Sequence, residues 1–201
     1  MKRIFVINPG CTSTKVAVYE DENPVWTSDG LHDPAEIDKF STINEQYEYR
    51  KDFVLNLLKE AGIPLKFDAV IGRGGLLKPL QGGVYAINEL MKKDLWNAKH
   101  QHVCNLGSLI ADEIAHECHC PAFMADPVVV DEMMTRARYT GLPFMKRESI
   151  FHALNAKAAS RRYARSIGKS YEELNLVVAH LGGGICVSAH HNGKVIDVNN
   201  A

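Results

Sequence analysis

Two turns of small and polar residues are the parts of this sequence best suited to binding an anion. The first runs from Asn8 to Lys15 and reads Asn-Pro-Gly-Cys-Thr-Ser-Thr-Lys, and the second runs from His180 to Gly184 and reads His-Leu-Gly-Gly-Gly. Small residues allow backbone N–H groups to converge on an anion without a Cβ in the way. Hydroxyl groups and the lysine would add donors to the first turn, so each turn is a candidate phosphate site.

Each turn lies between two short hydrophobic segments that are typical of β-strands. We expect strands over residues 3–7 and 15–19 around the first turn, and over residues 176–181 and 185–189 around the second. Two such turns facing each other would hold a polyphosphate from both sides. Neither turn matches the Walker pattern or the dinucleotide-binding pattern, and both lead into strands rather than into a helix N-terminus. The alternative is that both turns are ordinary β-hairpins.

The rest of the chain alternates helical and strand patterns, as in an α/β fold. Apolar residues at helical spacing predict the helices, and short apolar runs that end at turns predict the strands. The predicted helices are 49–62, 87–95, 107–118 and 150–166, and the further predicted strands are 25–28, 68–72, 121–126 and 194–198. The pair Arg161-Arg162 on the last helix is expected on a solvated face.

Composition excludes several classes of protein. The chain has 201 residues with 23 Lys and Arg against 24 Asp and Glu, so it lacks the basic excess of a general nucleic-acid binder. No apolar run approaches the length of a membrane span, and the N-terminus does not resemble a signal peptide. The five cysteines are scattered and odd in number, which suits a reducing cytoplasm. We therefore expect a cytoplasmic protein with neither a nucleic-acid nor a membrane partner.

The segment Val6–Lys15 resembles the opening of butyrate kinases, in the acetokinase family of the acetate and sugar kinase, Hsp70 and actin superfamily. Further motifs agree in order and spacing, and the resemblance covers essentially the whole chain. These motifs are Ile71-Gly72-Arg73-Gly74-Gly75, Asn105-Leu106-Gly107, Asp126-Pro127-Val128-Val129, Ser149 to Asn155 and His180 to Gly184. The resemblance implies an actin-like (ribonuclease H-like) ATPase domain over residues 1–146, with a mixed five-stranded sheet and flanking helices. It implies the truncated beginning of a second such domain over residues 147–201.

The same resemblance implies an enzyme that transfers a phosphoryl group to a carboxyl acceptor. ATP would donate its γ-phosphoryl group reversibly to butyrate, or to a similar short-chain or branched fatty acid, giving butyryl phosphate and ADP with Mg²⁺ as the metal. A homo-oligomer is implied at full length. Acetate or propionate as the acceptor, and a non-catalytic phosphate- or nucleotide-binding module of the actin fold, stay open as alternatives. Because family members are longer, we expect little or no kinase activity from this chain alone.

Roles for individual residues also follow from the resemblance. The implied catalytic residues are Arg73, Asp126 and His152, with Asp126 also a magnesium ligand, directly or through water. Arg73 and Asn105 would line the substrate pocket. The residues implied in phosphate and nucleotide binding are Asn8, Ser13, Thr14, Lys15, His180, Gly182, Gly183 and Gly184.

The implied chemistry needs cations and donors more than it needs a base. A carboxylate is already ionised at neutral pH, so the obstacle is the approach of an anion to a polyanion. Positioning and charge neutralisation by Arg73, His152, magnesium and the turn amides would meet this need. Each residue also has a plainer alternative: a surface salt bridge for Arg73, a turn for Asp126, a core histidine for His152 and solvent exposure for Lys15.

Overall fold

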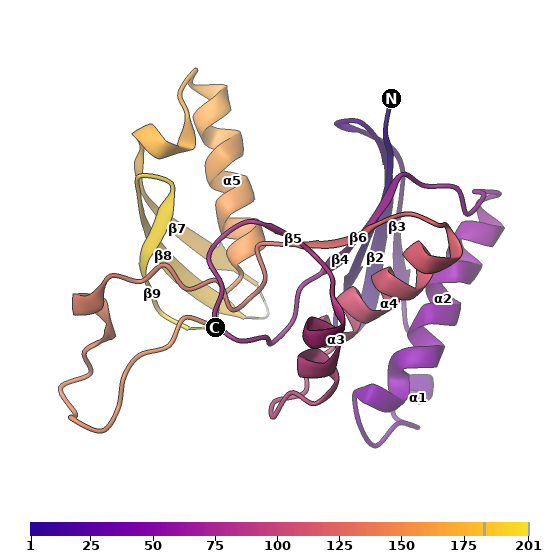
Figure 1. The fold of residues 1–201 in the computed structure, drawn as a ribbon, viewed down its shortest axis with the longest axis horizontal. Helices are drawn as coiled ribbons and strands as arrows, with labels where there is room; N and C mark the ends of the chain where they lie inside the picture. The colour runs from indigo at the N-terminus through magenta and orange to yellow at the C-terminus, as the bar shows by residue number, and fades with distance from the viewer. Residues whose placement is uncertain (183, 201) are drawn as a thin grey trace. The chain divides into compact units, whose positions relative to one another are not determined.

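The computed structural model describes residues 1–182 and 184–200 and divides into two compact units (Figure 1). The first unit comprises Met1–Leu77 and Val84–Ala125, and the second comprises Lys78–Gly83 and Asp126–Ala201. The predicted boundary between two actin-like domains, after residue 146, stays a prediction.

The first unit is built on a six-stranded mixed sheet with the strand order β3-β2-β1-β4-β6-β5. Its strands are β1 (Arg3–Pro9), β2 (Ser13–Glu20), β3 (Asn23–Leu31), β4 (Ala69–Arg73), β5 (Val84–Ala86) and β6 (Ala122–Ala125). Strands β1, β4 and β6 run parallel, whereas β2, β3 and β5 are antiparallel to their neighbours. The expected α/β fold with a mixed sheet is confirmed, but the expectation of five strands is wrong. The added strand β5 has only three residues, too few to show an alternating pattern.

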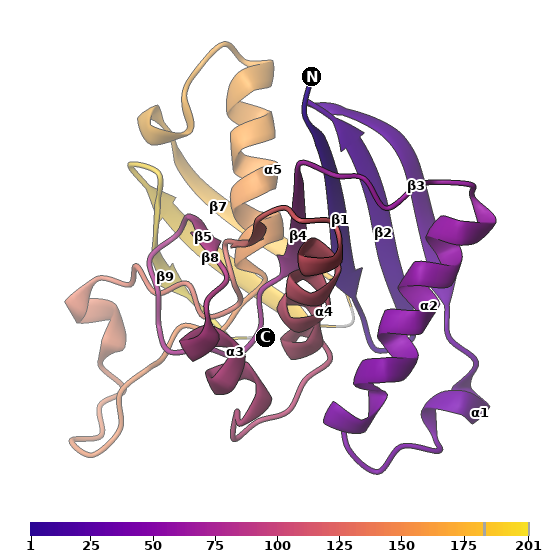
Figure 2. The same cartoon turned by 45° about the vertical axis from the view of Figure 1, so that its right-hand side comes forward.

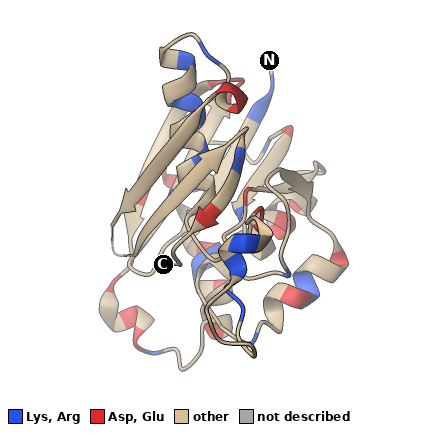
Figure 3. Cartoon of the chain, turned by 90° about the vertical axis from the view of Figure 1, so that its left-hand side faces the viewer, with Lys and Arg blue, Asp and Glu red and all other residues tan. Residues whose placement is uncertain are grey.

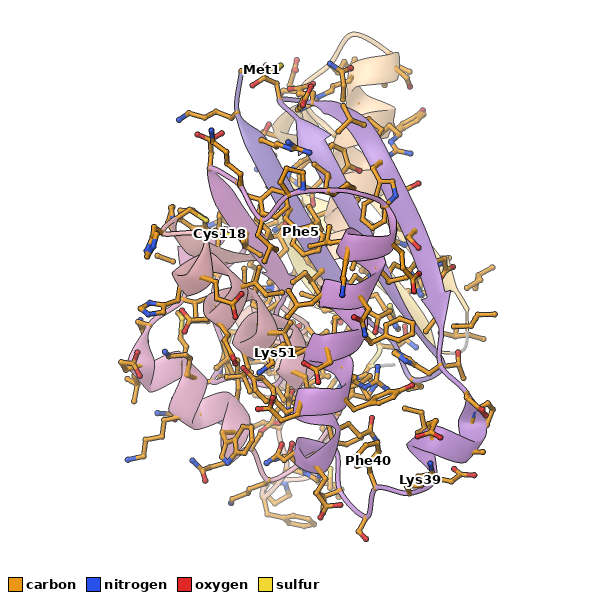
Figure 4. All side chains as sticks on the ribbon, turned by 90° about the vertical axis from the view of Figure 1, so that its right-hand side faces the viewer. Met1, Phe5, Lys39, Phe40, Lys51 and Cys118 are labelled. Atoms are coloured by element: carbon orange, nitrogen blue, oxygen red, sulfur yellow. The ribbon has the colours of Figure 1, made fainter. Side chains whose placement is uncertain are left out.

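Helices α2 (Tyr47–Glu60) and α4 (Cys104–Glu117) cover one face of this sheet (Figure 2). Helix α3 (Glu89–Trp96) packs against α4, and the short helix α1 (Pro34–Ile37) buries none of its residues. Alternate residues of β1 point toward the helices, so Phe5 and Ile7 are fully buried in the core with Val54 of α2 and Ile110 of α4. Figure 4 shows Phe5 between the sheet and the helices. The opposite face of β1 and β2 carries Asn8 and Lys15 outside this core.

The second unit packs α5 (Ala153–Ser166) with the antiparallel sheet β7 (Asn175–Leu181), β8 (Ile185–His191) and β9 (Lys194–Val198). Its core includes Phe151, Cys186 and Val195. The strands carry few charged residues (Figure 3). Asn192 and Gly193 both have positive φ, at 49° and 74°, which is the hairpin turn that an Asn-Gly pair favours. Among the helices of the described residues, none is long and apolar enough to cross a membrane.

Candidate active site

Residues of the first hairpin alternate between the buried face of the sheet and its opposite face. Asn8 of β1 pairs with Lys15 of β2 in the antiparallel register. On the side away from the helices, Lys15 Nζ lies 2.9 Å from Asp29 Oδ2 of β3, and both side chains are more than half exposed. Hydrogen bonds from Lys15 and then from Ser13 lower the pKa of Asp29 below its ordinary value. Lys15 therefore already has a carboxylate partner that sequence reasoning did not anticipate.

Asn8 and Lys15 line one shallow groove of about 350 Å³ on this face of the sheet. The other lining residues come from the same three strands and are Val6, Val16, Ala17, Tyr19, Thr27, Ser28 and Asp29. The groove thus joins two of the predicted phosphate-binding residues to Asp29, the carboxylate that neutralises one of them.

Thr14 points to the opposite face of β2 and is fully buried. Its Oγ1 lies 2.8 Å from His32 Nε2 and 3.4 Å from Arg50 Nη1. The hydroxyl is enclosed and already hydrogen-bonded, which argues against the predicted phosphate contact through this side chain. Strand alternation is the reason, because successive side chains of β2 face opposite sides of the sheet.

Arg73 closes β4 beside the first hairpin. Its Nη1 donates a hydrogen bond of 3.4 Å to Asn8 Oδ1. No carboxylate pairs with Arg73 in the part of the chain that the structure describes, in contrast to Lys15. The backbone around Arg73 is held closely by α4, since a Cβ on Gly107 would lie 2.6 Å from the Arg73 carbonyl oxygen. The structure therefore places Asn8 next to both Lys15 and Arg73. The Arg73 backbone packs closely against α4, while its guanidinium has no carboxylate partner among the described residues.

Asn105 lies under the loop that follows Arg73. It is fully buried, and its Oδ1 accepts a hydrogen bond of 2.9 Å from the Leu76 amide. A Cβ on Gly75 would lie 2.6 Å from the Asn105 Cα, so the loop and the start of α4 are in close contact. This placement favours a role in shaping the loop over the predicted direct contact with substrate.

His102 links two cysteines next to the same hairpin. Its Nε2 lies 4.0 Å from Cys11 Sγ, and its Nδ1 lies 3.0 Å from Cys104 Sγ. Desolvation, followed by the nearby charges of Arg73 and Arg50, lowers the pKa of His102. Burial raises the pKa of Cys104 to about 11, so this thiol is protonated at neutral pH. His102 was not singled out from the sequence.

Asp126 follows β6 and belongs to the second unit. Its side chain is 5% exposed, its Oδ1 accepts from the Gly83 amide at 2.9 Å, and its Oδ2 lies 3.0 Å from Arg161 Nη1. Its φ of 36° is uncommon for a residue other than glycine. Arg161 and Arg162 are both exposed, as expected for a solvated face. The sequence did not predict that Arg161 also forms an ion pair with this buried carboxylate.

A magnesium ion would find few protein ligands here. Among residues 1–182 and 184–200, no group of three or more His, Cys, Asp and Glu side chains is arranged to hold a metal ion. Asp126 is the one predicted ligand, and its carboxylate is already engaged by Arg161. Magnesium commonly keeps several waters and binds through one or two carboxylates together with substrate phosphates. Contact between Asp126 and a nucleotide-bound magnesium through water stays a prediction.

His152 and His180 lie face to face in the second unit. Their ring centroids are 3.8 Å apart and their planes differ by 8°. Asn155 Nδ2 lies 2.8 Å from His180 Nδ1, so the amide donates to this nitrogen and leaves the proton of a neutral His180 ring on Nε2. His152 Nδ1 lies 3.4 Å from Cys186 Sγ. Two predicted site residues are thus brought together, with Asn155 as an orienting partner that sequence reasoning did not assign.

The second turn follows His180 directly. A Cβ on Gly182 would lie 3.3 Å from His180 Nε2, so a larger residue would crowd this ring. Gly184 is partly exposed, and the prediction for Gly183 lies outside the described residues. The predicted residues fall into two groups by unit: Asn8, Ser13, Thr14, Lys15, Arg73 and Asn105 in the first, and Asp126, His152, His180, Gly182 and Gly184 in the second. In the second unit His180 contacts His152 and lies next to Gly182, whereas Asp126 contacts Gly83 and Arg161.

A larger cavity of about 770 Å³ lies elsewhere in the first unit, against α3 and α4. None of the predicted site residues lines it. Its carboxylates are engaged internally, Asp112 with Lys92 at 2.6 Å and Glu113 with Lys51 at 2.8 Å. The predicted chemistry is therefore not located in this cavity.

Comparison with known proteins agrees with the sequence motifs. A sequence profile of the acetokinase family matches residues 143–200. The chain is 68% identical over 199 residues to a probable butyrate kinase of Phocaeicola vulgatus, covering 99% of this chain and 56% of that protein. It is 54% identical over 200 residues to a probable butyrate kinase of Bacteroides thetaiotaomicron, covering 99% of this chain and 57% of that protein. The resemblance to butyrate kinases is confirmed, and the chain spans a little over half the length of these relatives.

The fold has solved counterparts. The structure matches the Porphyromonas gingivalis acetate kinase with a TM-score of 0.69 at 16% identity, covering 98% of this chain and 57% of that one. At this identity the likeness establishes the fold alone. It confirms the actin-like fold class that the motifs implied.

Proposed function

From its similarity to butyrate kinases over nearly its whole length, we propose that this chain is part of a carboxylate kinase. The proposed reaction is reversible transfer of the ATP γ-phosphoryl group to butyrate, or to a similar short-chain or branched fatty acid, giving butyryl phosphate and ADP. The observation that carries the proposal is the 68% identity over 199 residues to a protein named as a probable butyrate kinase. Because the chain spans 56% of that relative, the reaction is proposed for the whole protein.

The first group of residues would bind the anions. Arg73 combines a fixed backbone with a guanidinium that has one long hydrogen bond, at 3.4 Å to Asn8. Its guanidinium can therefore donate hydrogen bonds to a carboxylate or a phosphoryl oxygen without first breaking a salt bridge. Lys15 would have to exchange Asp29 for a phosphate, which makes it the weaker of the two cations in the resting state.

The second group would stabilise charge that develops during transfer. With Nδ1 of His180 accepting from Asn155, a neutral His180 presents its N–H at Nε2, on the side of the glycine turn. His152, stacked on this ring, would supply a second donor to the transferring phosphoryl group. Bound magnesium would neutralise phosphate charge, with Asp126 reaching it through water.

The acceptor and the completeness of the site can be tested together. Acyl phosphate formed from ATP and magnesium is trapped with hydroxylamine, with butyrate, propionate, acetate and a branched acid compared as acceptors. The assay is run on this chain and on a version continued through its own reading frame. We expect the longer protein to prefer butyrate or a branched acid, and this chain alone to form little product. A preference for acetate would replace the proposed acceptor, and nucleotide binding without product in both forms would favour a binding module.

Location and assembly belong to the same proposal. We expect the whole protein in the cytoplasm, because its substrates would be a nucleotide and a small soluble acid. The homo-oligomer is expected from the resemblance alone. Sedimentation of the continued version and fractionation of the cells that make it would test both expectations.

A further inference from the structure

Arg50 of α2 is a fully buried arginine beneath the first hairpin. Arginine is almost never fully buried unless it is paired with an anion. No carboxylate pairs with Arg50 in the part of the chain that the structure describes. Its guanidinium instead uses all three nitrogens on neutral acceptors, so a cation is kept inside the unit without a balancing charge.

Two of these acceptors are backbone carbonyls of the hairpin. Arg50 Nη1 donates to the Gly10 carbonyl at 2.9 Å, and Nη2 donates to the Cys11 carbonyl at 3.3 Å. Nε donates to Gln46 Oε1 at 2.9 Å, at the residue that precedes α2, which fixes the guanidinium plane. The fork of the guanidinium thus holds two consecutive peptide groups of the hairpin from below.

His32 completes this network as a neutral partner. Desolvation, followed by the charge of Arg50, lowers the pKa of His32 to about 4, so the ring is neutral near pH 7. Its Nε2 lies 3.1 Å from Arg50 Nη1 and therefore accepts, which leaves the ring proton on Nδ1. That Nδ1 is buried without a hydrogen-bond partner. The network is arranged around the cation and adds no negative charge to it.

Peptide geometry links these contacts to the other side of the hairpin. In a trans peptide the C=O and N–H of one unit point in opposite directions. The Gly10 carbonyl shares its peptide unit with the Cys11 amide, and the Cys11 carbonyl shares its unit with the Thr12 amide. Since both carbonyls point toward Arg50, both amides point away from it. Neither amide donates a hydrogen bond to any described residue.

We infer that Arg50 is a positioning residue for an anion site formed by the amides of Cys11 and Thr12. Its clamp on the two carbonyls turns both N–H groups outward, and its uncompensated charge lies behind them. An anion on the outer side would meet two aligned dipoles backed by a full positive charge. The site suits a phosphate oxygen of a nucleotide or an acyl phosphate. The inference rests on the proposed function, because it assigns the phosphate of that reaction to this hairpin.

Pyrophosphate is a suitable probe, because it carries the phosphate chemistry and does not require the adenosine pocket. The chain is labelled with ¹⁵N and titrated with pyrophosphate, and the amide signals of Cys11 and Thr12 are followed. Three variants are compared: R50K, which keeps the charge but loses the fork; R50M, which loses both; and L58A. The control residue Leu58 is also buried in α2, about two turns beyond Arg50, and its apolar side chain makes none of the hydrogen bonds of the Arg50 network, so L58A is a control for general destabilisation.

We expect both amide signals of the unaltered chain to shift on titration and L58A to retain its affinity. R50M should bind pyrophosphate at least about tenfold more weakly, because two charge-assisted hydrogen bonds and the charge are lost. R50K should fold and show displaced Cys11 and Thr12 signals before any ligand is added, with an intermediate affinity. If R50M does not fold, the comparison of R50K with the unaltered chain tests the positioning role of Arg50.

The outcomes separate the inference from the function on which it rests. If the unaltered chain binds pyrophosphate with no shift at Cys11 and Thr12, or does not bind it, the phosphate role of the hairpin is wrong. If the two amides shift in the unaltered chain but R50K matches it in affinity and in ligand-free signals, the positioning role of Arg50 is wrong while the hairpin site stands. Equal losses of pyrophosphate affinity in L58A and the Arg50 variants would also overturn the positioning role of Arg50, because they would indicate general destabilisation.

Discussion

The ring of His152 lies parallel to the ring of His180, with centroids 3.8 Å apart and an angle of 8° between the planes. The first residue precedes α5 and the second lies in β7, so the contact joins a helix N-terminus to a strand end. Both residues were predicted site residues, yet nothing in their spacing predicted that they would touch. The stack makes the orientation of one ring depend on the other.

Asn155 is expected to set the tautomer of His180. In Asn155→Leu the donor to Nδ1 is lost, so the fraction of neutral ring with its proton on Nε2 should fall. The measurement is the pair of ring ¹⁵N chemical shifts of His180. A matched control is Asn175→Leu, which removes the partner that lies 2.5 Å from His191 Nδ1 in the same sheet and should leave His180 unchanged. An unchanged His180 tautomer in Asn155→Leu would contradict the prediction.

Arg161 is expected to hold the Asp126 carboxylate. Arg161→Met leaves Asp126, which is 5% exposed, with the Gly83 amide as its remaining donor among the described residues. We expect a loss of about 1 to 2 kcal/mol in the free energy of unfolding, because the lost hydrogen bond is charge-assisted but its arginine is partly solvated. Denaturant unfolding checks this value. Arg162→Met, at the exposed neighbouring position, should change stability little, and equal effects in the two variants would exclude a specific role for Arg161.

Asp29 is expected to compete with phosphate for Lys15. Asp29→Asn removes the charge that lies 2.9 Å from Lys15 Nζ and should therefore tighten pyrophosphate binding severalfold at low salt. The gain in pyrophosphate affinity should shrink as salt screens both charges. Calorimetry at two ionic strengths measures this affinity. Asp21→Asn, on the turn after β2, is the control because it changes the charge by the same amount. A gain of the same size in Asp21→Asn would indicate a general field effect instead.

The local elements of this protein could be predicted from its sequence, but their partners could not. Both strand–turn–strand units and the Asn192-Gly193 hairpin follow from short-range patterns, and the structure contains them. Arg50 and Gly10, in contrast, are 40 positions apart, so no local pattern shows that a charged helix residue is buried under the hairpin. The salt bridges of Asp29 and Arg161 could not be predicted for the same reason, because a salt bridge depends on the fold that brings two segments together.

Glu132 and Lys157 form a buried ion pair in the second unit, with side chains 7% and 2% exposed and 2.7 Å between the charged atoms. Burial raises the pKa of Glu132, but hydrogen bonds from Lys157 and from the amides of Val195 and Gly82 outweigh it, so the net pKa is below 4.5. Lys157→Met leaves a buried carboxylate unpaired and should cost about 3 to 5 kcal/mol of unfolding free energy near pH 7.

The sign of the pH dependence tests this account. A carboxyl with a lowered folded pKa stabilises the protein above its unfolded pKa and loses that contribution as the pH falls. The difference in unfolding free energy between Lys157→Met and the unaltered chain should therefore be largest near neutral pH and shrink as Glu132 becomes protonated. The double variant Glu132→Gln with Lys157→Met should recover part of the loss. A difference that stays constant with pH would assign the cost to packing around Lys157.

His32 is expected to destabilise the folded chain in mild acid. Its folded pKa of about 4 lies below the ordinary 6.5, so the unfolded chain binds a proton that the folded chain does not between these values. Stability should therefore fall as the pH drops from 6.5 toward 4, by at most about 3 kcal/mol from this residue. His190, whose pKa is also lowered to about 4 by desolvation and Lys157, should add a similar contribution in the second unit.

Variants that cannot titrate separate the two histidines. His32→Gln keeps a polar group beside Thr14 and Arg50 but removes the proton uptake, so unfolding free energy measured across this pH range should vary less steeply than in the unaltered chain. His190→Gln should flatten the remaining slope. If His32→Gln retains the full slope, folding does not lower the pKa of His32, and the prediction is wrong.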